Sequence, residues 1–283
     1  MKTLTEKYKS ILIETFEAFI NFCNEHNLKY IAAYGTVIGA VRHKGLIPWD
    51  DDIDVYMQRE DYERFISLKK HLKNSNYEIV SIENDKGYYL PYAKYCCKTT
   101  SLWEVKRHPF MIGVFIDIFP LDRVSSNLDI TKRVKLKYDK YFANYINCII
   151  DYTLKESINF LMNFHLKTAF HGIMQKLFYK YFAEYYRTKF INLDKRINNN
   201  VGEKFLCYST TYDLRKEIYE IDWILDTIEV PFETLVINIP RNYHDYLSSI
   251  YGNYMELPPI EKRFSTHEHF FLSLTKRINI HDL

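Results

Sequence analysis

Residues 132–190 contain no proline and a single glycine, although they are rich in tyrosine, phenylalanine, isoleucine and leucine. Proline and glycine are the residues that most often interrupt helices, so this composition predicts a long, largely helical segment. The segment carries eleven lysine and arginine residues against four acidic ones, a local charge of +7. Because the whole chain carries only +2, the remainder is acidic, and we expect no nucleic-acid partner held by overall charge.

Short helices and strands are predicted on both sides of this segment. Apolar residues recur at helical spacing in four stretches, which predict helices over residues 4–25, 36–41, 61–72 and 243–251. Short apolar or alternating runs predict strands over residues 29–33, 52–57, 77–82, 88–97 and 111–119, the last closed by Pro120, and near Trp223 and Val236. We therefore expect an α+β fold, with a mixed β-sheet flanked by helices and a largely helical insertion.

The distribution of charge and cysteine predicts a cytoplasmic protein. Residues 1–27 carry charges throughout, so we expect no signal peptide. The longest uncharged stretches, such as residues 141–150, reach only about half of the roughly 20 residues that a membrane span needs. The five cysteines form no C-x-x-C pair, which is typical of reduced, mostly buried thiols.

Two carboxylates on one strand are the first sign of chemistry. Alternate residues of a strand point to the same face, so Asp52 and Asp54 lie side by side while Ile53 and Val55 point into the core. Two carboxylates about 6–7 Å apart repel each other unless a cation lies between them. Oxygen ligands of this kind suit Mg²⁺ or Mn²⁺. An isolated acidic triplet, Asp50 to Asp52, would also fit a solvated loop.

Asp117 is a lone acid in the apolar run from Val114 to Phe119. A buried carboxylate is costly unless a cation or a firm set of hydrogen bonds compensates its charge. Asp117 is therefore either the third member of the acid site, on a neighbouring strand, or the partner of a core arginine or lysine.

A glycine turn and a basic run precede the acid pair. Gly35 and Thr36 stand where a strand enters a turn, and a glycine there lets a phosphate approach the backbone N–H groups closely. Arg42, His43 and Lys44 add positive charge where a phosphorylated donor would lie. Taken alone, that run is an ordinary exposed basic stretch; its occurrence with the glycine turn and the three acids favours a phosphate-handling site.

The residues described so far resemble a known family. Gly35-Thr36 followed by the acid pair is similar to the signature of the nucleotidyltransferase superfamily, and the string GTVIGAVRHKGLIPWDDDIDV, residues 35–55, resembles the hallmark of the LicD family of phosphotransferases. Residues 111–122, which hold Asp117 in IDIFPLD, resemble the family's next block. Residues 230–259 resemble its C-terminal part, whereas residues 132–190 lie outside the resemblance.

The resemblance implies a nucleotidyltransferase-like fold. Residues 1–130 would form the catalytic core, residues 131–205 a basic, aromatic-rich helical segment, and residues 206–283 a LicD-type segment that completes the catalytic domain. It also implies transfer of a phosphorylated alcohol, such as phosphocholine from CDP-choline, to a hydroxyl of a cell-surface glycan (lipopolysaccharide, teichoic acid or capsule) or of its lipid-linked precursor.

Specific roles follow from the resemblance, residue by residue. Mg²⁺ or Mn²⁺ would be held by Asp52, Asp54 and Asp117, and Asp117 is a candidate acceptor of the hydroxyl proton. The donor phosphates would contact Gly35, Thr36 and Arg42, with His43 and Lys44 as further candidates. Beyond Pro259, Arg263 and His267 are candidates to close over the site.

Two other functions use the same acids. A nucleotidyltransferase in the narrow sense would move a nucleoside monophosphate and release pyrophosphate, whereas the phosphotransferase would release CMP. A non-catalytic nucleotide- or metal-binding module would bind without turnover. Product analysis separates the three.

The basic helical segment also has two interpretations. It is either a plain helical subdomain with a solvated face, or a surface that lies on the inner face of the membrane near a lipid-linked acceptor. The aromatic composition would also suit a cage for a quaternary ammonium group, for which Trp49 and Trp103 are the nearest candidates along the chain.

Overall fold

The structure is a computed structural model that describes residues 4–163, 165–197, 202–210, 213–265, 267 and 269–283. Its helices are α1 (Leu4–Glu25), α2 (Tyr34–Ile38), α3 (Arg59–Ser67), α4 (Leu128–Ile149), α5 (Leu154–Met162), α6 (Leu166–Leu177), α7 (Ala183–Ile197), α8 (Ile221–Leu225) and α9 (Tyr243–Tyr251). Its strands are β1 (Ile31–Ala32), β2 (Asp54–Gln58), β3 (Tyr77–Val80), β4 (Ala93–Cys97), β5 (Ser101–Trp103), β6 (Phe115–Val124), β7 (Lys204–Leu206), β8 (Ile218–Glu220), β9 (Thr227–Phe232), β10 (Leu235–Pro240) and β11 (Phe271–Ser273).

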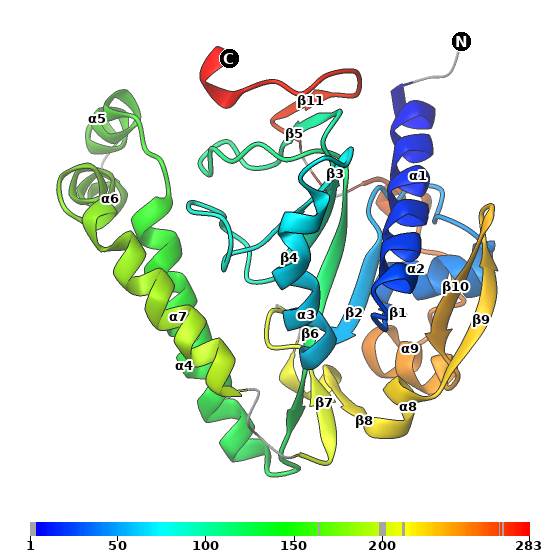
Figure 1. Ribbon diagram of the computed structural model, residues 1–283. Helices are drawn as coiled ribbons and strands as arrows, with labels where there is room; N and C mark the ends of the chain where they lie inside the picture. Colours follow the sequence, from blue (N-terminus) through cyan, green and yellow to red (C-terminus); the bar gives the residue numbers. More distant parts are fainter. Residues whose placement is uncertain (1–3, 164, 198–201, 211–212, 266, 268) are drawn as a thin grey trace.

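A mixed β-sheet holds the centre of the molecule and confirms the predicted α+β class (Figure 1). Its strands run in the order β1-β2-β6-β4-β3. Strands β2 and β6 are parallel, while the other neighbouring pairs are antiparallel. Helix α1 covers the sheet with buried aromatic residues, among them Phe19, whose ring lies 5.7 Å from that of Tyr95 on β4. The predicted helix over residues 4–25 is confirmed.

Strand β6 continues past Pro120, which corrects the expected end of this strand. The Asp117 N–H donates to the Ile53 carbonyl, so odd-numbered residues of β6 direct their backbone groups toward β2. Pro120 therefore faces the other edge, where pairing with β4 has already ended at Ile118. The missing N–H of proline removes no ladder bond at that position. From Asp122 onward, β6 pairs with β7.

Other elements also differ from the sequence prediction. Strand β2 begins at Asp54 rather than at residue 52. Strand β4 begins only at Ala93, directly after the stretch that contains Pro91, which has no N–H to donate. Trp223 lies in the short helix α8 instead of a strand; the pairing of β8 ends at Glu220, and Asp222 stands in the first turn of α8, where an acid favours helix. The strand near Val236 is confirmed as β10.

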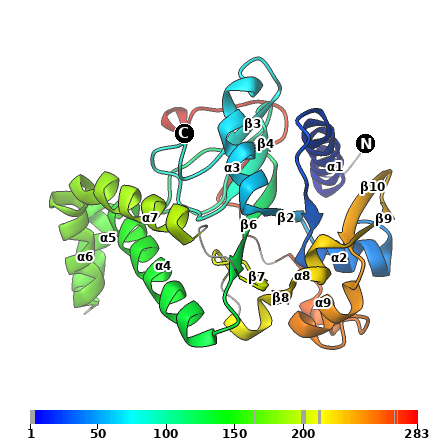
Figure 2. The same cartoon turned by 60° about the horizontal axis from the view of Figure 1, so that its bottom comes forward.

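Helices α4 to α7 confirm that residues 132–190 are helical. We call this unit, residues 128–197, the helical arm; both views show it to one side of the sheet (Figures 1 and 2). The break before α5 arises without proline or glycine, because Thr153 and Glu156 form a capping box that starts a new helix. No helix in the part of the chain that the structure describes has both the length and the apolar character needed to cross a bilayer. All five cysteines are buried and free, as predicted.

A buried ion cluster fixes the helical arm to the sheet. Arg59 of α3 forms ion pairs with Asp122 of β6, at 2.7 Å, and with Asp194 of α7, at 2.5 Å. All three residues are almost completely excluded from solvent. Burial raises the pKa of the Asp194 carboxyl to about 7, and the nearby charge of Asp122 contributes to the increase. The guanidinium of Arg59, which the two carboxylates share, opposes this shift.

We expect the contribution of Asp194 to the free energy of unfolding to fall as the pH rises from about 4 to about 7. A carboxyl whose pKa is higher in the folded state than in the unfolded state binds its proton more tightly when folded, so stability is lost as that proton leaves. The Asp194→Asn variant should show a shallower decrease in chemical denaturation measured at several pH values in EDTA. If the free energy of unfolding depended equally on pH in the variant and the unaltered protein, the raised pKa of Asp194 would be contradicted.

Candidate active site

The three predicted aspartates meet at the ends of β2 and β6. Asp54 is the first residue of β2 and lies directly opposite Asp117 on the parallel strand β6. Asp52 precedes Asp54 by two residues, as the alternation required. Each of the three offers a carboxylate oxygen, and these oxygens all lie within 4.8 Å of one another. Three oxygen ligands at this separation could hold one divalent cation.

A cavity of about 380 Å³ opens over these acids. Its lining combines carboxylates, aromatic rings and small polar groups: Tyr34, Gly35, Asp50, Asp52, Asp54, Tyr92, Asp117, Phe119, Ser209, Thr210, Tyr251 and His267. The lining comes from both the N-terminal and C-terminal parts of the chain.

The electrostatics of the acid cluster fit a cation. Burial raises the pKa of Asp54 well above its usual range, and the neighbouring carboxylates of Asp52 and Asp117 raise it further. Burial also raises the pKa of Asp117, to about 6, against the opposing effect of Lys94. Carboxyl groups that repel one another in this way are stabilised in their charged form by a bound cation. Aspartates are also the hard oxygen donors that Mg²⁺ and Mn²⁺ prefer.

Lys94 is a candidate site residue that the sequence analysis missed. It lies on β4 opposite Asp117, and its Nζ is 2.7 Å from Asp117 Oδ1 and 3.3 Å from Glu104 Oε1. The same Nζ lies 3.1 Å from the centre of the Phe115 ring. Lys94 is completely buried. A lone lysine in the predicted strand over residues 88–97 was the available signal, of the same kind that singled out Asp117.

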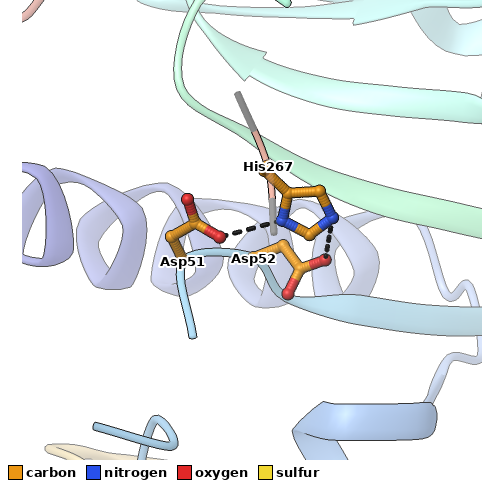
Figure 3. Close-up of side chains that lie close together, drawn as sticks. All are labelled: Asp51, Asp52 and His267. Atoms are coloured by element: carbon orange, nitrogen blue, oxygen red, sulfur yellow. Dashed lines mark hydrogen bonds and ion pairs between the residues drawn. The ribbon is translucent and has the colours of Figure 1, made fainter. Parts of the chain in front are cut away.

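The C-terminal part of the chain reaches the acids through His267. Strand β11 pairs with β5 in a separate two-stranded sheet, which anchors this part of the chain. His267 Nδ1 lies 2.8 Å from Asp51 Oδ1, and its Nε2 lies 3.6 Å from Asp52 Oδ2 (Figure 3). The bond to Asp51 raises the pKa of His267 to about 9. Arg263 lies over the Trp49 ring, 5.5 Å from its centre, and is outside the lining of the acid cavity.

Gly35 and Thr36 lie in the first turns of α2, beside the acids. Gly35 lines the cavity, and a Cβ at this position would come within 2.9 Å of Asp50 Oδ2. The buried hydroxyl of Thr36 accepts a hydrogen bond of 2.8 Å from the backbone N–H of Asp54. Thr36 therefore fixes the start of β2, and the roles of both residues toward a donor phosphate stay predictions.

The predicted basic run lies outside the lining of the acid cavity. Arg42 and His43 end the π-helix of residues Gly39–His43, and Lys44 follows it with a φ of 59°. The Arg42 guanidinium donates to the carbonyls of Tyr254 and Glu256. The two tryptophans proposed for an aromatic cage also lie outside this lining; the rings inside it are Tyr34, Tyr92, Phe119 and Tyr251.

A buried glutamate supports the wall of the cavity from behind. Glu217 accepts hydrogen bonds from the hydroxyls of Tyr34, Tyr219 and Thr210, at 2.7 to 3.1 Å. The hydroxyl of Tyr246 on α9 accepts a hydrogen bond from the backbone N–H of Tyr34. Because buried, satisfied networks are rigid, these bonds hold α2 and the C-terminal elements in a fixed relation around the cavity.

Two comparisons relate the chain to known proteins. Residues 27–151 match the model of the LicD/FKTN/FKRP nucleotidyltransferase domain, a stretch that contains all three aspartates and Lys94. The chain is 27% identical over 276 residues to the lipopolysaccharide cholinephosphotransferase LicD of Haemophilus influenzae, which covers 94% of this chain and 97% of that protein. By both comparisons, the chain is similar to the LicD family.

Shorter stretches of this chain are similar to two uncharacterised proteins. One, from Rickettsia typhi, is 34% identical over 76 residues, which cover 27% of this chain and 25% of that protein. The other, from Rickettsia prowazekii, is 51% identical over 37 residues, or 13% and 14% of the two chains. The family resemblance drawn from residues 35–55 is therefore confirmed.

Proposed function

We propose that this protein is a metal-dependent phosphotransferase that moves phosphocholine, or a similar phosphorylated alcohol, from a nucleotide-diphosphate donor such as CDP-choline to a hydroxyl of lipopolysaccharide or a related glycan. The observation that carries the proposal is the convergence of Asp52, Asp54 and Asp117 in one cavity. It is supported by similarity, over nearly the whole chain, to a lipopolysaccharide cholinephosphotransferase.

The chain's own groups suit each part of this reaction. Asp52, Asp54 and Asp117 would hold Mg²⁺ or Mn²⁺, which, when bound, neutralises charge on the donor phosphates. Lys94 favours the ionised form of Asp117 and would fix its orientation through the contact with Oδ1. The Tyr92 and Phe119 rings, whose centres are 4.3 Å apart, line the same cavity. Aromatic faces attract quaternary ammonium groups, so these rings are suited to choline.

The experiment that tests this function is product analysis. Purified protein is incubated with CDP-choline, Mg²⁺ and lipopolysaccharide, and we expect release of CMP with phosphocholine bound to the glycan. EDTA should stop both, and Mn²⁺ should restore them. Release of pyrophosphate from CTP and free phosphocholine would instead identify a nucleotidyltransferase in the narrow sense. Binding without turnover, across CDP-choline, CDP-ribitol and other activated alcohols, would identify a non-catalytic module.

A further inference from the structure

Helices α5 and α6 of the helical arm have the reverse of the usual amphipathic arrangement. On α6, four apolar residues at positions i, i+4, i+7 and i+11 are exposed to solvent: Leu166, Phe170, Ile173 and Leu177. Among the residues of this helix whose burial the structure describes, the buried ones are Gly172 and the polar Gln175. Surface helices of globular proteins normally turn their apolar stripe inward. An outward apolar stripe indicates that something covers it.

Helix α5 repeats this pattern beside α6. It buries Ser157 and exposes Ile158, Leu161 and Met162, the last with 75% of its surface accessible. Gly172 of α6 packs against Ser157 so closely that a side chain at Gly172 would not fit. The small residues thus hold the two helices together and leave the large apolar ones outside. The exposed apolar surface continues over residues 178–182, where Phe178, Tyr181 and Phe182 are also exposed.

Unpaired positive charge surrounds this apolar surface. Lys155, Lys167 and Lys180 are exposed, and the described residues provide no acidic partner for any of the three. Residues 132–190 as a whole carry eleven basic side chains against four acidic ones. A second copy of the chain would bring this charge against itself. An anionic lipid surface is complementary to it, because lysines bind the headgroups while the apolar and tyrosine side chains enter the interface.

From these observations we infer that α5, α6 and residues 178–182 form a docking surface for an anionic phospholipid bilayer. The protein would lie on the membrane rather than span it, with the apolar stripe of α6 at the boundary between headgroups and acyl chains. In both views α5 and α6 lie on the side of the arm away from the hairpin of β9 and β10 (Figures 1 and 2). The inference rests on the arm alone and is independent of the reaction proposed for the acid cavity.

Co-sedimentation with vesicles tests this inference. The full chain should bind vesicles of phosphatidylglycerol and phosphatidylethanolamine, bind phosphatidylcholine vesicles weakly, and lose binding as the salt concentration rises. The double variant Met162→Glu/Phe170→Glu should lower the partition coefficient at least about tenfold, because two apolar side chains no longer enter the bilayer. The variant Lys167→Glu/Lys180→Glu should lower it by about fivefold or more for each basic residue removed.

Matched controls separate docking from general effects. Val236→Glu places an acid at an exposed apolar position of β10, and Lys7→Glu reverses an exposed lysine of α1; neither should change vesicle binding. Thermal unfolding should show that all variants remain folded. Failure of the unaltered protein to bind anionic vesicles would overturn the inference. So would unchanged binding by a folded Met162→Glu/Phe170→Glu variant, or a dimer in sedimentation velocity that this variant dissociates.

Discussion

Asparagine in place of Asp54 is expected to abolish transfer and, in EDTA, to raise the melting temperature. Asp54 is crowded by the carboxylates of Asp52 and Asp117, which disfavour its charged form. The amide removes that repulsion while keeping the shape, so stability should rise by about 1 kcal/mol or more, or about 2–4 °C for a chain of this size. Loss of a metal ligand removes about 4 kcal/mol of charge stabilisation, so activity should fall about a thousandfold.

Added metal distinguishes the two effects. Mg²⁺ or Mn²⁺ should raise the melting temperature of the unaltered protein, and the increase should be absent in Asp54→Asn. Asp139→Asn is the matched control, because Asp139 is an exposed acid of the helical arm whose only described ion pair is with Lys135. It should change neither activity nor the response to metal. Retained transfer by Asp54→Asn, or an unaltered metal response, would refute the role of the three aspartates.

Removal of Lys94 is expected to lower the stability of the protein, whereas Asp54→Asn should raise it. Lys94→Met keeps most of the volume but leaves Asp117 without its cation in the interior. Breaking a buried ion pair from one side costs about 3–5 kcal/mol. Because the isolated Asp117 carboxylate can be neutralised by a proton, the loss should be smaller at pH 5 than at pH 8. Chemical denaturation at the two pH values measures both the loss and its pH dependence.

A double-mutant cycle identifies Asp117 as the partner concerned. Lys94→Met/Asp117→Asn should recover about 0.5–3 kcal/mol relative to the sum of the single variants, since neither then leaves a charge unpaired. Some loss should remain, because Glu104 loses its contact with Lys94 and keeps only its bond to the Tyr89 hydroxyl. Lys135→Met, which breaks an exposed pair with Asp139, should cost no more than about 0.5 kcal/mol. Strictly additive effects of Lys94 and Asp117 would show that the pair has no energetic role.

The acid part of the site could be predicted from sequence because it depends on local rules. Alternation along a strand places Asp52 and Asp54 on one face, and a lone acid in an apolar run drew attention to Asp117. The same rules predicted α1, the helical character of the arm and a mixed sheet. They could not place Pro120 inside β6, because whether a proline interrupts a strand depends on where the neighbouring strand ends.

The rest of the cavity depends on contacts between distant segments. Ser209, Thr210 and Tyr251 join the lining through the packing of β7, β8 and α9, which leaves no local signature. Lys94 was visible as a lone lysine in an apolar strand, but nothing in its own stretch named Asp117 as its partner. The exposure of apolar residues on α5 and α6 was equally hidden, since periodicity shows that a helix has an apolar face but not which way that face points.

Strand β6 has a practical consequence for mutational scanning. It carries Asp117 at the acid cavity and, five positions later, Asp122, which binds Arg59 and through it the helical arm. Substitutions at Asp122 or Arg59 should therefore inactivate the protein in a screen at growth temperature as fully as substitutions at the cavity. Their defects should be temperature-sensitive and recover in the cold, whereas loss of Asp117 should persist at every temperature. Scoring variants at two temperatures would separate residues needed for folding from residues needed for the reaction, even before the substrate is identified.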